Sequence, residues 1–405
     1  MIRKLSVHDL LPGMYVVDLH QSWLAHSVWR RRFKVDSLDH VRKLIDAGIE
    51  DVSIDTARGI DLPPPPAAGL HDIAQRIARQ PLARKPAPAP ATVSLGEERR
   101  RAGRLLQQGV QLLDALTLAA RAGRAVEVAS LEPVISKMMA SVARNPDALV
   151  PLARLKRLDA YATEHAVATA GLIIALGRQQ GVGAPELEKM ALGTMLKDIG
   201  HAAIDARLTD KRGQLSQQEF SIVQGHVEEG LAVLEATTRL PETTVAVVLE
   251  HHERYNGSGY PYRMAGDEIS LAGRLAAIVD TYDAMTSDRP YRAAMSPTDA
   301  LRQLYEQAGS HYDPSLVAGL VKTLGVYPVG TLVMLESGHL AVVESLHPDN
   351  LLSPVVNVIY HGARQQYVTP LRVDLARTVG NHYGQIVRAE DFGRWGLSPT
   401  RWQPA

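Results

Sequence analysis

Histidine and aspartate residues recur through the middle of this 405-residue chain, within stretches whose apolar residues follow helical spacing. Imidazole nitrogens and carboxylate oxygens are the donors that iron, manganese and zinc accept in proteins. A buried imidazole or carboxylate needs a hydrogen-bond partner or a cation, because an unpaired polar group in the interior is costly. Each of these residues taken alone is more typical of a hydrogen-bonded structural residue, but their buried settings make them candidates for chemistry, with a metal as one possible partner. They are His165, Asp198, His226, His251, His252 and Asp280.

The strongest local signal is the segment Glu250-His-His-Glu-Arg-Tyr-Asn-Gly-Ser-Gly-Tyr-Pro261. Two adjacent imidazoles lie at the expected end of a helix and lead into a loop with two glycines, which lets backbone approach a ligand closely. An ordinary helix end with an Asn-Gly turn explains the same residues equally well. Gly259, Tyr260 and Pro261 are the candidate substrate-binding part of this loop.

Arg289 and Arg292 follow the apolar helical stretch that contains Asp280. Two guanidinium groups at this spacing could fork onto phosphate oxygens. They could equally pair with Asp283 and Asp288, so both interpretations remain open.

Composition limits the function classes. The chain has no cysteine, which excludes disulfides, thiolate nucleophiles and thiolate metal ligands. Basic and acidic residues both number 44, so no global positive field exists to hold long nucleic acid. We find no signal-peptide pattern and no apolar run of membrane-spanning length, and we expect a cytoplasmic protein without a membrane span.

The chain is predicted to have five parts. A small α/β domain is expected first, with a helix over 40–47 and a strand over 51–55, followed by a Pro/Ala-rich spacer and two connecting helices. A helical domain and then a small antiparallel sheet are expected in the rest of the chain, and the sheet has strands over 331–335, 340–344 and 355–360. The predicted boundaries are 1–61, 62–93, 94–150, 151–325 and 326–405.

The order of these motifs resembles the HD-GYP family of cyclic di-GMP phosphodiesterases. The resemblance covers about residues 155–325 and implies a helical bundle of the HD superfamily. The fold class is therefore mainly α, with the small N-terminal α/β domain and the C-terminal antiparallel sheet added. Residues 4–55 resemble a domain of unknown function that often precedes HD-GYP domains.

The resemblance also implies chemistry. The six candidate ligands would bind one or two divalent ions, with iron or manganese favoured, and Asp198 would bridge two ions. Activated water would attack phosphorus and open cyclic di-GMP to linear pGpG, with further conversion to GMP left open. The Gly259-Tyr260-Pro261 loop, Arg289 and Arg292 would hold the dinucleotide.

The sequence departs from the family pattern at the pair that gives it its name. Lys197 precedes Asp198 where the family has histidine, and His201 stands where the family has a lysine that faces the phosphate. One hypothesis is compensation: on a helix that continues through Gly200 the two side chains would share a face, with His201 the ligand and Lys197 the charge. The other is that Lys197, with no free lone pair, fills the space of one metal as a built-in cation. Asp198, Lys197 and His201 are the candidate catalytic residues, and His201 is also a candidate phosphate contact.

A further departure is Tyr161, one turn before His165. Some members of the family carry there a glutamate that recruits a third metal, so at most two ions are expected.

Three functions remain in view. The first is a cyclic di-GMP phosphodiesterase, the second a receptor or regulatory protein that binds the dinucleotide without cleaving it, and the third a hydrolase of another nucleotide. Regulatory signalling proteins are possible partners, and homodimerisation is open.

Overall fold

A computed structural model describes residues 2–7, 10, 12–20, 32–59, 77, 93–152, 161–209, 211, 213–236, 239–288, 294–347, 350–377 and 382–402. Most of the predicted spacer, 62–93, lies outside these ranges. The chain divides into two compact units. Residues 1–68, grouped with 361–366, form the smaller unit, and 69–360 with 367–405 form the larger.

The described residues of the smaller unit form a four-stranded sheet and one helix. Its strands are β1 (Ile2–Ser6), β2 (Tyr15–Asp18), β3 (Phe33–Lys34) and β4 (Asp51–Asp55), in the order β1-β4-β2-β3 and paired antiparallel. Helix α1 (Leu38–Asp46) begins where the Ser37 side chain accepts a hydrogen bond from the backbone N–H of His40. Val16, Leu44 and Ile54 are fully buried in one core. The predicted helix and strand, and the α/β character of this part, are confirmed.

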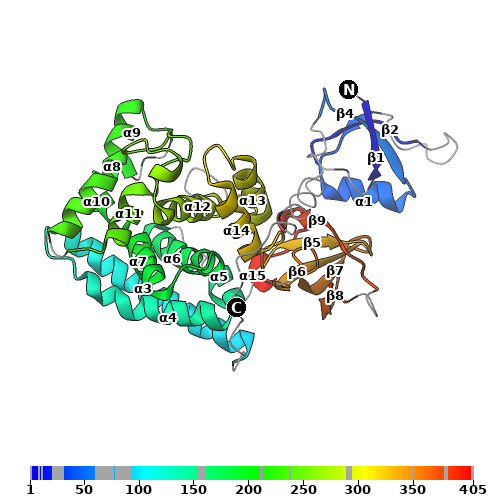
Figure 1. Ribbon diagram of the computed structural model, residues 1–405. Coiled ribbons are helices and arrows are strands. Elements are labelled where there is room, and N and C mark those ends of the chain that lie inside the picture. The colour runs from blue at the N-terminus through cyan, green and yellow to red at the C-terminus, as the bar shows by residue number, and fades with distance from the viewer. Residues whose placement is uncertain are drawn as a thin grey trace. The chain divides into compact units, whose positions relative to one another are not determined.

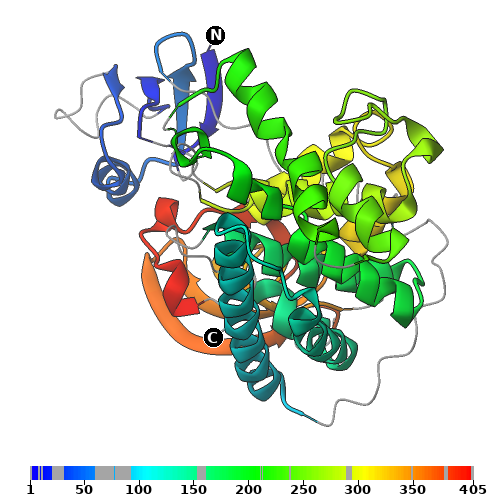
Figure 2. The same ribbon diagram turned by 90° about the vertical axis from the view of Figure 1, so that its left-hand side faces the viewer.

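Helices form most of the larger unit (Figures 1 and 2). Helices α6, α7, α11 and α12 pack on one another and carry the candidate site, while α3 and α4 lie along one side of this bundle in both views. Every residue over 166–177 of α6 and 190–196 of α7 is apolar or small and buried, so these helices bury most of their circumference there. The helices are α3 (Leu95–Arg121), α4 (Glu132–Arg144), α5 (Pro146–Leu152), α6 (Tyr161–Gln179), α7 (Ala184–Leu196), α8 (Ala206–Thr209), α9 (Gln217–Gln224), α10 (His226–Glu235), α11 (Glu242–Glu250), α12 (Leu271–Met285), α13 (Pro297–Glu306) and α14 (Pro314–Leu324).

A five-stranded sheet follows the helices, with order β8-β7-β6-β5-β9. Val333, Val343 and Val356 face the helices and belong to the same core, whereas Leu340 and Ile359 face a second, smaller apolar cluster. The strands are β5 (Leu332–Leu335), β6 (His339–Ser345), β7 (Val355–His361), β8 (Gln366–Asp374) and β9 (Ile386–Glu390), and the short helix α15 (Pro399–Trp402) comes last.

The predicted strands correspond to β5, β6 and β7, whereas β8 and β9 were not predicted from the sequence. β8 contains Pro370 and is largely exposed, so it lacks the apolar alternation of a half-buried strand. Proline is tolerated there because β8 is an edge strand, where a backbone N–H is not needed on the outer side.

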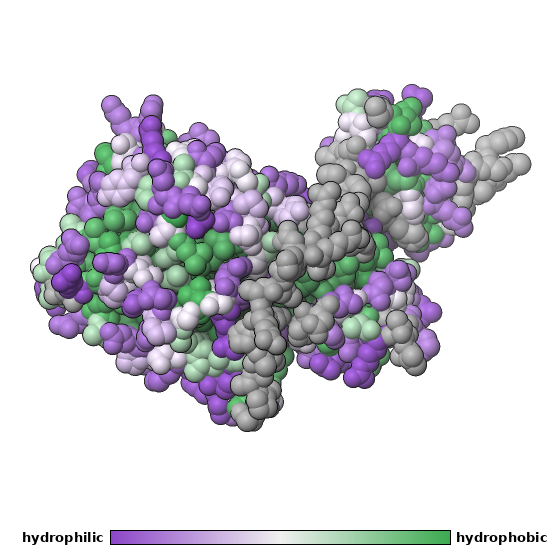
Figure 3. Space-filling view, viewed as in Figure 1, coloured by the Kyte–Doolittle hydropathy of each residue, from purple (hydrophilic) through white to green (hydrophobic). Residues whose placement is uncertain are grey.

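Polar and apolar residues are interspersed over the visible face of the helices in the larger unit (Figure 3). Within the described ranges, no helix is long and apolar enough to cross a membrane.

One buried ion pair fixes α3 against α4. The Glu98 side chain is 1% exposed and accepts hydrogen bonds from both Arg144 Nε and Nη2 at 2.8 Å and from Ser141 Oγ at 2.7 Å. The Arg144 hydrogen bonds hold the pKa of the Glu98 carboxyl below its ordinary value of 4.5. A carboxylate in this position therefore stabilises the folded chain.

We predict that Glu98→Ala lowers the free energy of unfolding by about 1 to 3 kcal/mol at neutral pH, because Arg144 loses its partner. Since the pKa of Glu98 is lower in the folded chain, its contribution is complete above 4.5 and is lost as the pH falls. Urea denaturation at several pH values should show the difference from wild type shrinking in acid. Glu97→Ala, which removes only an exposed pair with Arg101, is the control and should cost about 0.5 kcal/mol. Equal losses in the two variants would contradict the prediction.

Candidate active site

The six candidate ligands come from five separate elements and converge in one place. His165 lies on α6, Asp280 on α12 and His226 at the first position of α10, while Asp198 follows α7 and the His251–His252 pair follows α11. Their donor atoms form two groups, and within each group all atoms lie within 4.8 Å of one another. Asp198 belongs to both. One group is Asp198, His226, His251 and His252, and the other is His165, Asp198 and Asp280.

The imidazoles of His226 and His251 are oriented by backbone carbonyls. Each Nδ1 lies within hydrogen-bond distance of the carbonyl three residues earlier, Val223 O at 2.7 Å and Val248 O at 2.9 Å. A carbonyl only accepts, so Nδ1 carries the proton and Nε2 keeps its lone pair. Both Nε2 atoms lie 3.8 Å from Asp198 Oδ1.

These two Nε2 atoms are buried and find no hydrogen-bond partner among the described residues. Two unpartnered lone pairs directed at the same carboxylate oxygen are an arrangement that a divalent cation satisfies. The donor set of three imidazoles and one carboxylate suits iron, manganese or zinc. The residues of this group therefore fit a metal ion.

Burial keeps the imidazoles in the ligand form. It lowers the pKa of His251 to about 3, with the nearby Lys197 acting in the same direction, and it holds the pKa of His252 well below 6.5. Neutral imidazole is the form that binds metals, so the site is prepared to coordinate at neutral pH.

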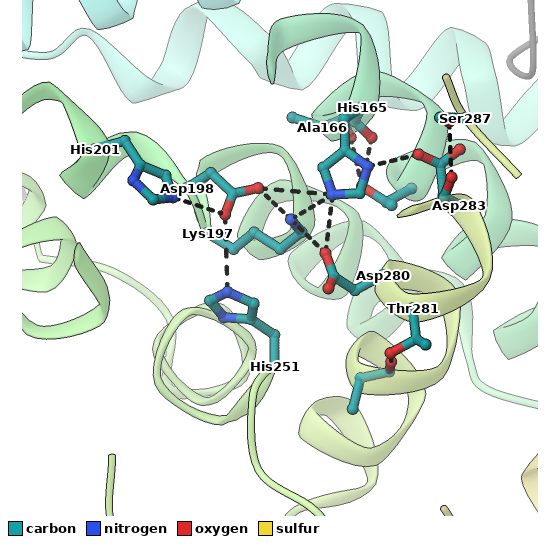
Figure 4. A network of polar contacts seen from close by, with 12 residues as sticks. His165, Ala166, Lys197, Asp198, His201, His251, Asp280, Thr281, Asp283 and Ser287 are labelled. Atoms are coloured by element: carbon teal, nitrogen blue, oxygen red, sulfur yellow. Dashed lines mark hydrogen bonds and ion pairs between the residues drawn. The ribbon is translucent and has the colours of Figure 1, made fainter. Parts of the chain in front are cut away.

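The second group already contains a positive charge. Lys197 is fully buried, and its Nζ lies 2.7 Å from Asp280 Oδ1, 3.1 Å from His165 Nε2 and in contact with Asp198 Oδ2. Figure 4 shows the lysine side chain extending between these three groups. The ammonium thus occupies the position at which all three donors point.

Lys197 remains protonated here. Burial alone would lower its pKa, but the two carboxylates, Asp198 first, raise it above the ordinary 10.5. Burial likewise opposes ionisation of Asp198 and Asp280, yet Lys197 brings the pKa of both well below 3.8. The centre is an ammonium between two carboxylates.

His165 is held from its other side. Its Nδ1 lies 2.5 Å from Asp283 Oδ2, and the Asp283 side chain is 1% exposed. Its Nε2 lies 2.9 Å from Asp280 Oδ1 as well as 3.1 Å from Lys197 Nζ. Asp283 and Asp280 thus hold the His165 ring from both of its nitrogens, and Asp283 supplies the kind of carboxylate partner that commonly orients ligating histidines.

The two exchanged residues do not share a helix face. Helix α7 ends at Leu196, and Ile199–Ala203 continues as a 3-10 turn. Lys197 meets Asp198 at Oδ2, whereas His201 Nε2 lies 3.9 Å from Oδ1 and its ring stacks on His226 at 4.1 Å. The compensation hypothesis was tied to a helix that continues through Gly200, and that condition is not met; Figure 4 shows His201 and Lys197 on different sides of Asp198.

Gly200 lets the 3-10 turn pack closely on α10. A Cβ built there would lie 1.9 Å from the carbonyl oxygen of His226 and 2.5 Å from Gly230 N, so only glycine permits this approach to α10. The contact fixes the start of α10, and with it His226, beside Asp198.

The loop after His252 forms one wall of a cavity of about 410 Å³. Tyr260 stacks on the His252 ring with centroids 4.6 Å apart, which joins the loop to the candidate ligands. A Cβ on Gly259 would lie 2.4 Å from Arg254 N, so this glycine allows the loop to fold back on its own backbone. The cavity is lined by Ser221, Gln224, Gly225, Glu228, Gly257, Ser258, Gly259, Tyr260, Pro261 and Arg263.

Comparison with known proteins adds to this geometry. Residues 137–316 match a family model described as HD domain, and residues 2–131 match one described as a domain of unknown function. The chain is 37% identical to a cyclic di-GMP phosphodiesterase of Pseudomonas aeruginosa over 98% of its own length and 94% of that protein. The chain belongs to the HD-GYP family.

Two further relatives match less than two fifths of the chain. A 3'3'-cGAMP-specific phosphodiesterase of Vibrio cholerae is 34% identical over 36% of this chain and 28% of that protein. A cyclic di-GMP phosphodiesterase response regulator of Xanthomonas campestris is 34% identical over 38% of this chain and 40% of that protein.

Some expectations lie outside the described residues. Arg289 and Arg292 are among them, and so is the side chain of Tyr161. Of the acids suggested as arginine partners, Asp283 contacts His165 and Asp288 accepts from the backbone N–H of Ala294.

The sequence analysis of this HD-GYP chain missed the role of Asp283 and the cavity residues Glu228 and Arg263. A signal for Asp283 was present, because it lies three residues after Asp280 on an apolar helix and so shares its face. Nothing in the sequence marks Glu228 or Arg263, since their relation depends on how the loop folds against α10.

We predict that Gly200→Ala weakens metal binding by the HD-GYP centre about tenfold or more, because α10 must shift and move His226. Gly230→Ala, whose Cβ would lie 3.2 Å from Gly200 N, should have a smaller effect. Gly103→Ala has open space around it in α3 and should leave binding unchanged while stabilising the fold slightly. Metal titration and thermal unfolding of the three variants check this order. Wild-type affinity in Gly200→Ala would contradict it.

Proposed function

We propose that this chain is a metal-dependent cyclic di-GMP phosphodiesterase. The observation that supports it most is the pair of unpartnered Nε2 atoms of His226 and His251, aimed at Asp198 beside the cavity of the Gly259–Pro261 loop. The Pseudomonas aeruginosa relative, which aligns along almost the whole chain, is named for the same activity. Since the relatives are named as phosphodiesterases, their names favour an enzyme that hydrolyses cyclic di-GMP over a receptor that only binds it.

The reaction is hydrolysis of one phosphodiester bond. The oxygen of a water molecule forms a new bond to phosphorus, the bond from phosphorus to the 3'-oxygen breaks, and that oxygen takes a proton to give linear pGpG. A divalent ion held by Asp198, His226, His251 and His252 would supply Lewis acidity, which activates water near neutral pH and neutralises phosphate charge. Tyr260 and its loop would hold the dinucleotide against this centre.

We further propose that the centre binds one ion rather than two, with iron or manganese favoured. Lys197 Nζ lies among the donors of His165, Asp198 and Asp280, so its ammonium would take the role of a second cation. It keeps the two carboxylates ionised and in place. His201 stacks on His226 at the other oxygen of Asp198, which favours a built-in cation over an exchange of roles between the two residues.

We predict that purified protein with Mn(II) or Fe(II) converts cyclic di-GMP to pGpG, and that a chelator stops the reaction. His226→Ala should lower kcat/KM by about a hundredfold or more, because it removes a ligand. His382→Ala changes an exposed histidine of the C-terminal part and serves as the matched control. Chromatography of the products checks both. Tight binding of cyclic di-GMP without any pGpG would contradict the proposal.

A second prediction concerns metal content. Elemental analysis should find about one transition-metal ion per wild-type chain and about two in Lys197→His. The variant replaces an ammonium, which has no lone pair, by a neutral imidazole that can bind a second ion. We expect kcat/KM to rise with the second ion, on the order of tenfold. Lys189→His, which alters an exposed lysine paired with Glu186, should bind as wild type does. Two ions in the wild-type protein would rule out the built-in cation.

A further inference from the structure

The cavity beside the candidate metal centre has two facing walls of different origin. One wall comes from the junction of α9 and α10, with Gln224, Gly225 and Glu228, and the other from the loop after α11, with Tyr260 and Arg263. Gly225 directly precedes the candidate ligand His226, and Tyr260 stacks on His252. The cavity is thus separated from the candidate ligand His252 by the ring of Tyr260. Its volume of about 410 Å³ is within the range of small-ligand pockets.

The two walls carry opposite charges, and neither charge is paired with another described residue. Glu228 is exposed at the α10 wall, and Arg263 is exposed at the loop wall. Neither side chain makes a hydrogen bond or an ion pair with another described residue. Both residues line the cavity.

The backbone holds Arg263 in an unusual conformation. Its φ is +56°, in the left-handed region that a non-glycine residue rarely adopts. Glu253, 1% exposed, accepts hydrogen bonds from the backbone N–H groups on both sides of it, Tyr262 N at 2.7 Å and Met264 N at 3.1 Å. Strained residues persist where the surroundings fix them, and they concentrate at ligand sites. Glu253 is a positioning residue for Arg263.

A guanine base has two edges that match this pair of charges. Its Watson–Crick edge offers the N1–H and N2–H donors, which a carboxylate accepts. Its O6 and N7 atoms are both acceptors and take the two donors of a guanidinium fork, the commonest specific contact to guanine. Adenine reverses the pattern at the corresponding places, since its exocyclic N6 is a donor and its N1 an acceptor. A cavity with an acid on one wall and an arginine on the other thus distinguishes the two bases.

We propose that this cavity is a guanine-selective subsite in which Glu228 reads N1–H and N2–H and Arg263 reads O6 and N7. The inference rests on the proposed function and names the residues that set its base specificity. A cyclic dinucleotide places one base here, with Tyr260 beside it, while the bond to be cleaved lies at the centre. Selection at one base admits cyclic di-GMP, excludes cyclic di-AMP and admits 3'3'-cGAMP in a single orientation.

The test compares kcat/KM and binding affinity for cyclic di-GMP, 3'3'-cGAMP and cyclic di-AMP. Glu228→Gln should reduce the preference for cyclic di-GMP over cyclic di-AMP about tenfold or more. Glu229→Gln, on the neighbouring residue outside the cavity lining, should leave it unchanged. Equal losses for all three ligands in Glu228→Gln would overturn the inference.

Arg263→Lys separates base reading from simple charge attraction. Lysine keeps the positive charge but lacks the planar fork. If Arg263 contacts the base, Arg263→Lys should lose the preference for cyclic di-GMP over cyclic di-AMP; if it contacts only a phosphate, the preference should stay unchanged. Arg263→Asn is the second variant, because asparagine tolerates the left-handed conformation and removes the charge. Retention of the wild-type preference in both variants would overturn the inference.

The wild-type products of 3'3'-cGAMP give an independent readout. One guanine-selective subsite fixes the orientation, so a single linear isomer is expected, which fragmentation in a mass spectrometer identifies. A mixture of both isomers from the wild-type protein would overturn the inference. Absence of any hydrolysis would count against the proposed function alone, and the binding affinities for the same three ligands would still decide the base preference.

Discussion

Two buried carboxylates and an imidazole that converge on one point need a positive charge between them, because an uncompensated charge in the interior costs several kcal/mol. In this chain that charge is covalently attached: Lys197 Nζ contacts Asp198, Asp280 and His165 together. Three segments depend on the contact, since α6, α12 and the end of α7 each contribute a group. The other oxygen of Asp198 remains available to the imidazoles of His226 and His251.

The consequence is a centre with two unequal halves. The half with Lys197 is internally satisfied, and Asp283 completes it by holding Nδ1 of His165 while Asp280 contacts Nε2. The half with His226 and His251 has donors that no described residue satisfies. In the one-ion proposal, a divalent ion would satisfy the donors of the second half, whereas the ammonium of Lys197 occupies the first. The half with His226, His251 and His252 is also the one nearer the cavity, because His252 contacts Tyr260, which lines it.

Much of this arrangement could be predicted from the sequence because the residue types are unusual in their settings. An aspartate at 280 within an apolar helix, and paired imidazoles before a glycine loop, required a polar partner. The relation between Lys197 and His201 could not be predicted from spacing alone. It depends on the change from α7 to a 3-10 turn, which places the two side chains at different oxygens of Asp198 and in which Gly200 approaches the backbone of α10. Likewise, strand β8 escaped prediction because Pro370 and exposed residues remove the pattern that a buried strand carries.

The most direct test of the built-in cation is a crystal structure of the protein grown with Mn(II), with anomalous scattering measured to locate the metal. The account predicts one anomalous peak among Asp198, His226, His251 and His252, with Lys197 Nζ still in contact with Asp280. A second peak between His165 and Asp280, with the lysine side chain turned out of the centre, would contradict it.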